Sequence, residues 1–317
     1  MKSIASTKNM TREEWLALRR QGLGGSDAAA ILGLNPFASP FSVYMDKVGL
    51  APEKDESEAM WLGNQLEDAI AKRFETETGM KVQKRNSILQ HPEHIWMLAN
   101  VDRWVVGKKA GLEIKTTNML NRTHFDSGDV PSYFHAQCLH YMAVTGADEW
   151  YLAVAVLGRS FHIFRIERNE AEIAALVAAE KRFWEENVMK QVPPPPDGSE
   201  SDGNLMKALY PKEHGDNLLV PLFGAEEKLE RIQTLDAQIK SLEREEESLK
   251  QAIQKEIGDA DGGKAQGYTV WWRSQSRTSL DSKKLQKEQP DIFDRYARTS
   301  SFRKFEIKKE IREREAA

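Results

Sequence analysis

Apolar residues recur at helical spacing in the first part of the chain. Between residues 61 and 79 an apolar residue stands at every fourth position, which predicts an amphipathic helix that ends at Gly79. A shorter amphipathic helix is predicted over 12–20, where Thr11 and Glu14 have the spacing of a capping box. We therefore expect the chain to open with helices.

From residue 87 the period changes to that of strands. The segments 87–90, 95–106 and 112–117 are predicted strands separated by short turns, and we expect them to form an antiparallel meander. Three more elements follow, namely a helix over 131–145, a strand hairpin over 150–156 and 161–167, and a helix over 170–190. This order predicts an α/β (α+β) fold in which helices flank a central mixed sheet.

A run of four prolines marks a boundary in the chain. Pro193–Pro196 is followed by DGSESDG, and this stiff and then flexible composition is typical of a linker. We predict four segments: a core over 1–192, a linker or long loop over 193–226, a long amphipathic helix over 227–257 and a carboxy-terminal extension over 258–317.

The helix predicted over 227–257 has the alternating three- and four-residue apolar spacing of a coiled coil. Its apolar residues are Ile232, Leu235, Ile239, Leu242, Leu249 and Ile253, and Glu246 interrupts the series once. At 1.5 Å per residue the helix would be roughly 45 Å long. Oligomerisation through this stripe and an intramolecular helical hairpin both satisfy the pattern.

Charge is distributed unevenly along the chain. The 317 residues have a formal net charge of −4, yet the last 50 residues, from Tyr268, hold 13 Lys and Arg against 8 Asp and Glu. No bulk positive field indicates a nucleic-acid partner, so local patches or bound metal ions would have to supply the positive charge. The basic extension also contains GYTVWWRSQSR, which predicts a strand pair or an edge strand.

Composition excludes several classes of protein. The single cysteine, Cys138, rules out an intrachain disulfide framework, a four-cysteine zinc site and a cysteine-bound iron–sulfur cluster. No apolar run reaches the roughly 18 residues of a membrane span, and the first residues lack the apolar core of a signal peptide. We therefore expect a cytoplasmic protein that has no membrane partner.

An acidic pair and a lysine fall on adjacent predicted strands. Ten residues separate Asp102 from the tripeptide Glu113-Ile114-Lys115, in which Glu113 and Lys115 share one face while Ile114 points into the core. If a turn brings Asp102 beside Glu113, the two carboxylates repel each other unless a divalent cation lies between them. Lys115 could then orient a water or stabilise charge on a phosphate. The alternative is a solvated salt-bridge ladder across the sheet.

Three more polar residues lie on predicted inner faces. Glu67 is at the edge of the apolar stripe of the 61–79 helix, where it either serves the acidic pair or pairs with a Lys or Arg as a boundary residue. Gln137 and Tyr141 are four residues apart and share one face of their helix. Core packing explains Tyr141 as well as function does, whereas a glutamine on the same face favours a site.

A glycine-rich loop near the amino terminus is a candidate anion site. In RRQGLGGSDAAAILG, glycines free backbone N–H groups at the predicted start of a helix, beside the guanidinium of Arg19 and the hydroxyl of Ser26. The spacing matches neither a P-loop nor a dinucleotide fingerprint. The alternative is a simple N-cap by Ser26 or Asp27, and both interpretations can hold together.

Taken in order, these motifs resemble the YqaJ-type viral recombinase family of phage and prophage alkaline exonucleases. This family is placed within the PD-(D/E)XK nuclease superfamily, with the lambda exonuclease and RecB-like nuclease domains. The matching pieces lie within residues 12–190 and are LRRQGLGGSDAAAILGLNPFASP, WLGNQLEDAIAKRFETETG, ANVDRWV, GLEIKTT and HAQCLHYM. The resemblance implies a PD-(D/E)XK nuclease core over 1–192, although Val101 stands where the superfamily name has proline. GYTVWWRSQSR and FDRYARTSSFRKFEIK resemble an extension found in part of the family.

The resemblance also implies roles for the acidic residues. Glu67, Asp102 and Glu113 would serve a metal site, with the carbonyl of Ile114 as a further ligand. Lys115 would be the catalytic lysine. The metal would be Mg²⁺, with Mn²⁺ able to substitute.

Four more residues match positions of the family. Gln137 and Tyr141 match the Q-x-x-x-Y signature of RecB-like nucleases, which places them with the catalytic residues. Arg19 and Ser26 match the positions that hold the 5′-terminal phosphate in lambda-type exonucleases.

The function implied by the resemblance is that of a metal-dependent exonuclease. We expect it to degrade linear double-stranded DNA from 5′ to 3′ and to leave 3′ single strands for a single-strand annealing protein. Relatives form rings around DNA, so a homo-oligomer, in the form of a ring-shaped trimer, is expected. The alternatives are an endonuclease, a structure-specific or opposite-polarity nuclease on the same fold, and a non-catalytic DNA-end-binding recombination scaffold.

Overall fold

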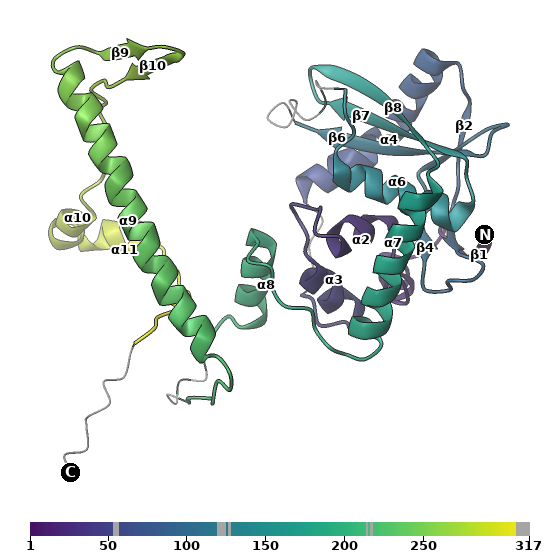
Figure 1. Cartoon of the computed structure of the whole chain (residues 1–317), viewed down its shortest axis with the longest axis horizontal. Helices are drawn as coiled ribbons and strands as arrows, with labels where there is room; N and C mark the ends of the chain where they lie inside the picture. Colours follow the sequence, from purple (N-terminus) through teal and green to yellow (C-terminus); the bar gives the residue numbers. More distant parts are fainter. Residues whose placement is uncertain (53–56, 119–124, 126–127, 214, 216–217, 309–317) are drawn as a thin grey trace. The chain divides into compact units, whose positions relative to one another are not determined.

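The computed structural model describes residues 1–317 except 53–56, 119–124, 126, 127, 214, 216, 217 and 309–317, so the last nine residues of the basic extension lie outside the described part. The chain divides into two compact units, Met1–Pro211 and Lys212–Ala317, whose elements are labelled in Figure 1. No helix in the described residues combines the length and the apolar character needed to span a membrane.

A five-stranded mixed sheet forms the centre of the first unit. Its strand order is β2 (Val82–Lys84), β5 (Arg103–Val105), β6 (Ala110–Thr117), β7 (Glu149–Val156) and β8 (Ser160–Glu167). β6 and β7 are parallel, and the other neighbours are antiparallel. The predicted mixed sheet and the predicted β7–β8 hairpin are confirmed.

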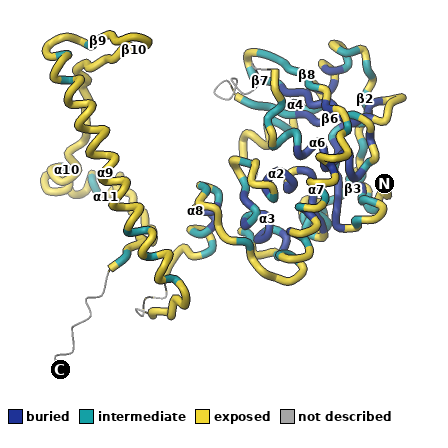
Figure 2. The backbone as a smooth tube through the Cα atoms, viewed as in Figure 1, coloured by how far each residue is buried: buried dark blue, intermediate teal, exposed yellow. Residues whose placement is uncertain are grey.

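Both faces of this sheet are covered, and β7 shows why its sequence is apolar throughout. Trp150, Leu152 and Val154 belong to a core cluster shared with the helix α6 (Ser132–Thr145), whereas Tyr151 and Ala153 belong to a second cluster shared with α4 (Glu58–Thr78). Most residues of β7 are buried, as Figure 2 shows. α4 ends at the left-handed Gly79, as predicted.

The predicted meander is wrong in one respect, because the segment 95–106 is two strands in two sheets. β4 (Leu98–Ala99) pairs with β3 (Ser87–Gln90), which pairs with β1 (Lys2–Ser6) in a separate three-stranded sheet. β5 resumes at Arg103 in the large sheet. The break between β4 and β5 includes Asp102. The carboxylate of Asp102 accepts a hydrogen bond from the N–H of Ile114, just beyond the end of the β5–β6 ladder.

α6 contacts β3 and β4 of the small sheet, and four more helices pack on α6 or on one another. They are α1 (Arg12–Arg20), α2 (Gly25–Ile31), α3 (Pro40–Lys47) and α7 (Glu170–Arg182), the last continued by a π-helical turn over Phe183–Val188. The capping box of Thr11 and Glu14 is confirmed. The predicted cap of α2 is wrong: Gly24 is the N-cap, and Asp27 at the third helical position accepts the Gly24 N–H.

The predicted linker over 193–226 contains a helix that belongs to the first unit. α8 (Glu200–Leu209) packs against α3, with Leu205 in the main core cluster. Asp202 is buried and accepts a hydrogen bond from the hydroxyl of Ser39, the N-cap of α3. The first unit therefore runs to Pro211 instead of ending near residue 192.

The second unit contains one long helix and several short elements. The helix is α9 (Glu226–Ile257), close to the predicted span of 227–257, and the short elements are β9 (Gly262–Ala265), β10 (Tyr268–Trp271), α10 (Ser282–Glu288) and α11 (Pro290–Tyr296). The tryptophan-rich segment contains β10, in agreement with the predicted edge strand, and β10 pairs antiparallel with β9, which precedes that segment. The alternative of an intramolecular helical hairpin does not appear among the described residues.

Candidate active site

β6 places Glu113 and Lys115 on the same face of the large sheet. Lys115 Nζ lies 2.6 Å from Glu113 Oε1, and the Glu113 side chain is only 3% exposed. Between them, Ile114 faces the other way and packs in the core cluster beneath α4. The predicted orientation of all three residues is confirmed, and the alternative of a solvated ladder does not fit a buried Glu113.

Asp102 reaches the same site from the break between β4 and β5. Its Oδ2 accepts a hydrogen bond of 2.8 Å from the backbone N–H of Ile114. Because burial and the nearby charge of Glu113 both disfavour a second carboxylate charge, the pKa of Asp102 lies well above its ordinary value. Asp102 thus lies close enough to Glu113 for the two charges to interact, as the prediction that the two carboxylates meet requires.

α6 supplies the amide that holds Glu113 and the hydroxyl that contacts this amide. Gln137 Nε2 donates to Glu113 Oε1 at 2.7 Å and lies 2.9 Å from the hydroxyl of Tyr141. The Tyr141 ring packs at a tilt against Trp150 of β7, with ring centroids 5.2 Å apart. Both interpretations of Tyr141 thus hold, since it packs in the core and also contacts the glutamine of the site.

Lys115 remains a cation in this environment. Burial alone would lower its pKa, but the charges of Glu113 and Asp102 outweigh that effect and raise it. Its Nζ also lies 5.3 Å from the ring centroid of Phe134, a cation–π distance. The site therefore presents one fixed positive charge beside two carboxyl groups.

The donor set at this site fits a hard divalent cation. Glu113 Oε2 is buried and has no hydrogen-bond partner among the described residues, which is costly for a carboxylate unless a cation satisfies it. Carboxylate and carbonyl oxygens are the ligands that Mg²⁺ prefers. In the described residues no three Asp, Glu, His or Cys side chains converge closely enough to hold an ion. Glu113 contacts Lys115, Glu67 contacts Arg103, and Asp102 accepts the N–H of Ile114.

Glu67 is the residue that departs most from expectation. Its carboxylate pairs with the guanidinium of Arg103, which the adjacent Asp68 also contacts at 2.5 Å. This contact agrees with the alternative interpretation, in which Glu67 is a boundary residue that pairs with an arginine. Glu67 still lies near enough to Asp102 to raise the pKa of that carboxyl, so it belongs to the periphery of the site.

A second cluster lies at the start of α2. Arg19 Nη2 contacts Ser26 Oγ at 2.6 Å and Asp27 Oδ1 at 2.9 Å, so the predicted pair of Arg19 and Ser26 does come together. Lys47, whose side chain is fully buried, lies 2.7 Å from Asp27 Oδ2. Burial alone would raise the pKa of Asp27, but Lys47 and Arg19 hold it well below its ordinary value.

In this arrangement the candidate donors to an anion are side chains more than backbone N–H groups. The Gly24 N–H is already taken by Asp27, and α2 is only seven residues long, so free helix-end N–H groups contribute less than the loop sequence predicts. The guanidinium of Arg19 and the hydroxyl of Ser26 remain as the donors that could face an anion.

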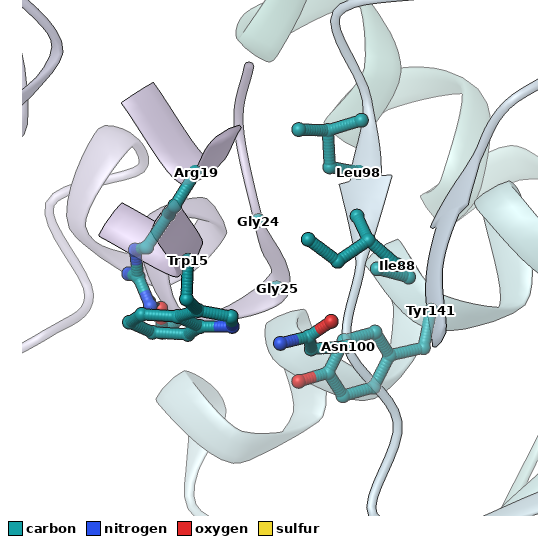
Figure 3. Close-up of a pocket in the computed structure, with 10 residues that line it drawn as sticks. Trp15, Arg19, Gly24, Gly25, Ile88, Leu98, Asn100 and Tyr141 are labelled. Atoms are coloured by element: carbon teal, nitrogen blue, oxygen red, sulfur yellow. Dashed lines mark hydrogen bonds between the residues drawn. The ribbon is translucent and has the colours of Figure 1, made fainter. Parts of the chain in front are cut away.

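The Arg19–Ser26 cluster opens onto a pocket that Tyr141 borders (Figure 3). Its lining residues are Trp15, Arg19, Gly24, Gly25, Ser26, Ile88, Leu98, Ala99, Asn100 and Tyr141. Tyr141 lines this pocket and also contacts Gln137, so one side chain joins the two clusters. Gly25 permits this packing, because a Cβ atom there would lie 2.6 Å from the Tyr141 ring.

Sequence reasoning missed three residues of these sites. Trp15 stands four residues before Arg19 on α1, and the guanidinium lies 5.3 Å from its ring centroid, so helical spacing could have found it. Asn100 has a buried side-chain oxygen without a partner among the described residues. No local pattern indicates Asn100, or the pairing of Arg103 with α4, because both depend on long-range packing.

Comparison with known proteins places the chain in a family. The model of the YqaJ-like viral recombinase domain matches residues 14–148. The uncharacterized protein YqaJ of Bacillus subtilis (strain 168) is 35% identical over 308 residues, which cover 96% of this chain and 97% of that protein.

Solved structures show a similar fold. An alkaline exonuclease from Laribacter hongkongensis, LHK-Exo, is 23% identical, with a TM-score of 0.49, and its complex with dAMP gives a TM-score of 0.50. Each match covers 57% of this chain and 94% of that chain. The chain thus shares the fold of these solved structures over 57% of its length, and it belongs to the YqaJ family of viral recombinase-like proteins.

Proposed function

We propose that the chain is a metal-dependent deoxyribonuclease that degrades linear double-stranded DNA from 5′ to 3′ and leaves 3′ single strands. One observation carries the proposal: the buried carboxylate of Glu113 is held by Lys115 and Gln137 beside Asp102, and one of its oxygens has no partner among the residues that the structure describes. Membership of a viral recombinase family and the likeness in fold to an alkaline exonuclease support it.

Asp102, Glu113 and the carbonyl of Ile114 are the groups that would hold Mg²⁺ or Mn²⁺. Glu67 would join them by giving up its contact with Arg103, which would keep Asp68 as a partner. When bound, the metal would supply a Lewis acid and a water of lowered pKa.

The protein's own residues would prepare the phosphodiester for attack. Gln137 would fix the rotamer of Glu113 through its 2.7 Å hydrogen bond, and Asp102 would stay anchored to the backbone of β6. Lys115 would orient the attacking water and stabilise negative charge as the water oxygen bonds to phosphorus. The P–O3′ bond then breaks, and the leaving 3′ oxygen takes up a proton.

The pocket beside this centre would set the polarity. Arg19 and Ser26 would bind the 5′-terminal phosphate, with Asp27 and Lys47 holding the guanidinium in place. Because Tyr141 borders both the pocket and the catalytic centre, an anchored end would be presented at a fixed spacing from the bond to be cut.

The cellular setting follows from the same proposal. The protein would act in the cytoplasm of a bacterial host on double-stranded DNA ends, and a single-strand annealing protein would receive the 3′ strands. As the family resemblance implies, it would work as a homo-oligomer, with a ring-shaped trimer as the expected form.

Digestion of end-labelled linear duplexes tests the proposal. Duplexes with a 5′ phosphate or a 5′ hydroxyl, and covalently closed circles, are incubated in Mg²⁺, in Mn²⁺ and in chelator. We expect metal-dependent release of nucleotides from 5′ ends and no cleavage of closed circles. Nicked circles would indicate an endonuclease, release from 3′ ends would indicate the opposite polarity, and metal-independent binding without cleavage would indicate a scaffold.

Arg19→Ala tests the end pocket separately. Each charge-assisted hydrogen bond is worth about 1.5–3 kcal/mol, so a wild-type preference of at least about tenfold for phosphorylated ends should largely disappear. Arg20→Ala is the matched control, because Arg20 faces Asp46 at 4.0 Å and does not line the pocket. If Arg19→Ala keeps the full preference, the assignment of the pocket is wrong.

A further inference from the structure

The hairpin of β9 and β10 presents a tryptophan ring on one of its faces. Every residue of β10 is exposed (Figure 2), and Trp271 is 62% exposed. In the antiparallel pairing Trp271 lies opposite Gly262, which has no side chain to cover the indole ring. The hairpin therefore leaves a large aromatic ring open to a partner.

Two cations accompany this ring. The guanidinium of Arg273 lies 3.7 Å from the centroid of the Trp271 ring, a cation–π contact. Because side chains alternate along a strand, Thr269 shares the face of Trp271, and its cross-strand partner Lys264 adds the second cation to that face. The ion pairs in the described part of the second unit involve other cations. Arg273 and Lys264 are therefore available to an external anion.

The positive charge of the second unit is concentrated in and after this hairpin. Residues 262–308 hold 11 Lys and Arg against 5 Asp and Glu. α9, in contrast, holds 6 Lys and Arg against 9 Asp and Glu. The hairpin and the segment that follows it thus complement a polyanion, whereas the long helix does not.

An open aromatic ring beside unpaired cations has the chemistry that recognises single-stranded nucleic acid. The cations bind phosphates, and the ring stacks on the face of an unpaired base. A duplex offers the same phosphates, but neighbouring base pairs cover its base faces, so it would use the cations and leave the ring idle. An acidic protein surface would also leave the ring without a role. The ring and the cations together favour a single strand.

We propose that the β9–β10 hairpin binds single-stranded DNA, with a base stacked on Trp271 and phosphates held by Arg273 and Lys264. The binding itself does not depend on cleavage by the first unit. The proposed exonuclease would generate such strands, and only this source of the ligand rests on the proposed function.

Fluorescence anisotropy of an oligothymidylate of about 20 nucleotides tests the proposal with the full-length chain. The assay is run in chelator, so it follows binding without cleavage, and its result does not depend on whether the first unit is a nuclease. The fluorophore is placed on the 5′ end, which then lacks the phosphate that the pocket at Arg19 would hold. A labelled duplex of equal length is measured beside the single strand.

Trp271→Ala removes the ring, and Trp272→Ala is the matched control. Trp272 is also exposed, and its N–H donates to the carbonyl of Asp261, so the strand alternation places its side chain on the other face of the hairpin. Trp271→Phe keeps an aromatic ring at the same position.

Trp271→Ala should weaken binding of the single strand at least about fivefold, because stacking of one base on an aromatic ring contributes that much. Trp271→Phe should recover part of this loss, and Trp272→Ala should bind as the wild type does. Affinity for the duplex should change less than about twofold in Trp271→Ala, since paired bases do not reach the ring. Wild-type affinity of Trp271→Ala for the single strand, an equal loss in Trp272→Ala, or an equal loss for the duplex would overturn the proposal.

Salt dependence separates the role of the cations from that of the ring. Each phosphate contact to a single strand contributes about 0.7 to the slope of log affinity against log salt concentration. Lys264→Gln should reduce the slope by about this amount, whereas Trp271→Ala should leave it unchanged. Lys240→Gln, which removes an exposed lysine of α9, is the control and should also leave the slope unchanged. A slope that is the same in Lys264→Gln and the wild type would contradict the assignment of this lysine to a phosphate.

A lipid surface is another partner that uses aromatic and basic side chains together. Flotation of the full-length chain with vesicles of phosphatidylglycerol and phosphatidylcholine distinguishes it from DNA. We expect no vesicle binding that depends on Trp271. Vesicle binding that is lost in Trp271→Ala, with unchanged affinity for the oligothymidylate, would overturn the proposal in favour of a membrane.

Discussion

The buried pair of His140 and Glu180 gives a sharp prediction about stability. Both side chains are fully buried, and His140 Nδ1 lies 2.8 Å from Glu180 Oε1. The other ring nitrogen, Nε2, lies 2.9 Å from the carbonyl of Leu98 in β4. Because a carbonyl can only accept, Nε2 carries a proton, and the histidine joins α6, α7 and the small sheet.

Glu180→Leu removes the acceptor and leaves His140 without its charged partner. Breaking one side of a buried pair costs about 3–5 kcal/mol, which for a unit of this size lowers Tm by roughly 6–20 °C. Glu180→Gln should cost less, because its amide can still donate to Nδ1 of a neutral imidazole. The double variant His140→Leu/Glu180→Leu should lose less stability than the sum of the two single changes.

The same pair predicts how stability depends on pH. Burial alone would lower the pKa of His140, but the charge of Glu180 and the hydrogen bonds to Glu180 and Leu98 raise it above 6.5. A histidine whose pKa is higher in the fold contributes stability that is complete below pH 6.5 and lost as pH rises through the folded pKa. The excess stability of the wild type over Glu180→Gln should therefore shrink as pH rises above 6.5.

Thermal unfolding followed by tryptophan fluorescence measures both effects. The wild type and the Glu180 variants are compared in a series of buffers from below pH 6.5 upward. Equal Tm values for the wild type and Glu180→Leu would refute the energetic argument. An excess over Glu180→Gln that stays constant above pH 6.5 would refute the assignment of a charged imidazole.

Three further predictions concern the site and the limits of the fold. Gly25→Ala places a Cβ 2.6 Å from the Tyr141 ring, so overpacking should lower the free energy of unfolding by about 1–3 kcal/mol, as thermal melting would show. The displaced Tyr141 should also lower the rate of DNA cleavage in a nuclease assay. A chain of residues 1–211 should fold and melt higher than one of residues 1–192, because only the longer one keeps α8; equal melting would contradict this. Glu67→Ala should lower metal-dependent cleavage, with partial recovery at higher Mg²⁺; loss of Tm with unchanged specific activity would make it a structural residue only.

Local patterns predicted the elements whose partners lie close in the sequence. The four-residue apolar spacing predicted α4, and the turn between two apolar strands predicted the β7–β8 hairpin. The pairing of β1 with β3 joins segments about eighty residues apart and leaves no local signal. α8 was missed because its polar sequence after four prolines is typical of a linker, although Leu205 anchors it in the core.

Sequence patterns predicted the residues at the centre of the candidate site but not the contacts of the residues around it. Strand alternation was enough to place Glu113 and Lys115 together, and helical spacing was enough to pair Gln137 with Tyr141. The partner of Arg103 could not be predicted, because it depends on how α4 lies across the sheet.

The most direct test of the central claim is the rate of Mg²⁺-dependent nucleotide release by Glu113→Gln. Glutamine keeps the size of the side chain and removes the charge that a cation would bind. We expect a loss of at least about 10²–10³-fold, comparable to removal of one group that stabilises a transition state, with normal folding and DNA binding. A purified Glu113→Gln protein that releases nucleotides at the wild-type rate would show that the catalytic centre lies elsewhere.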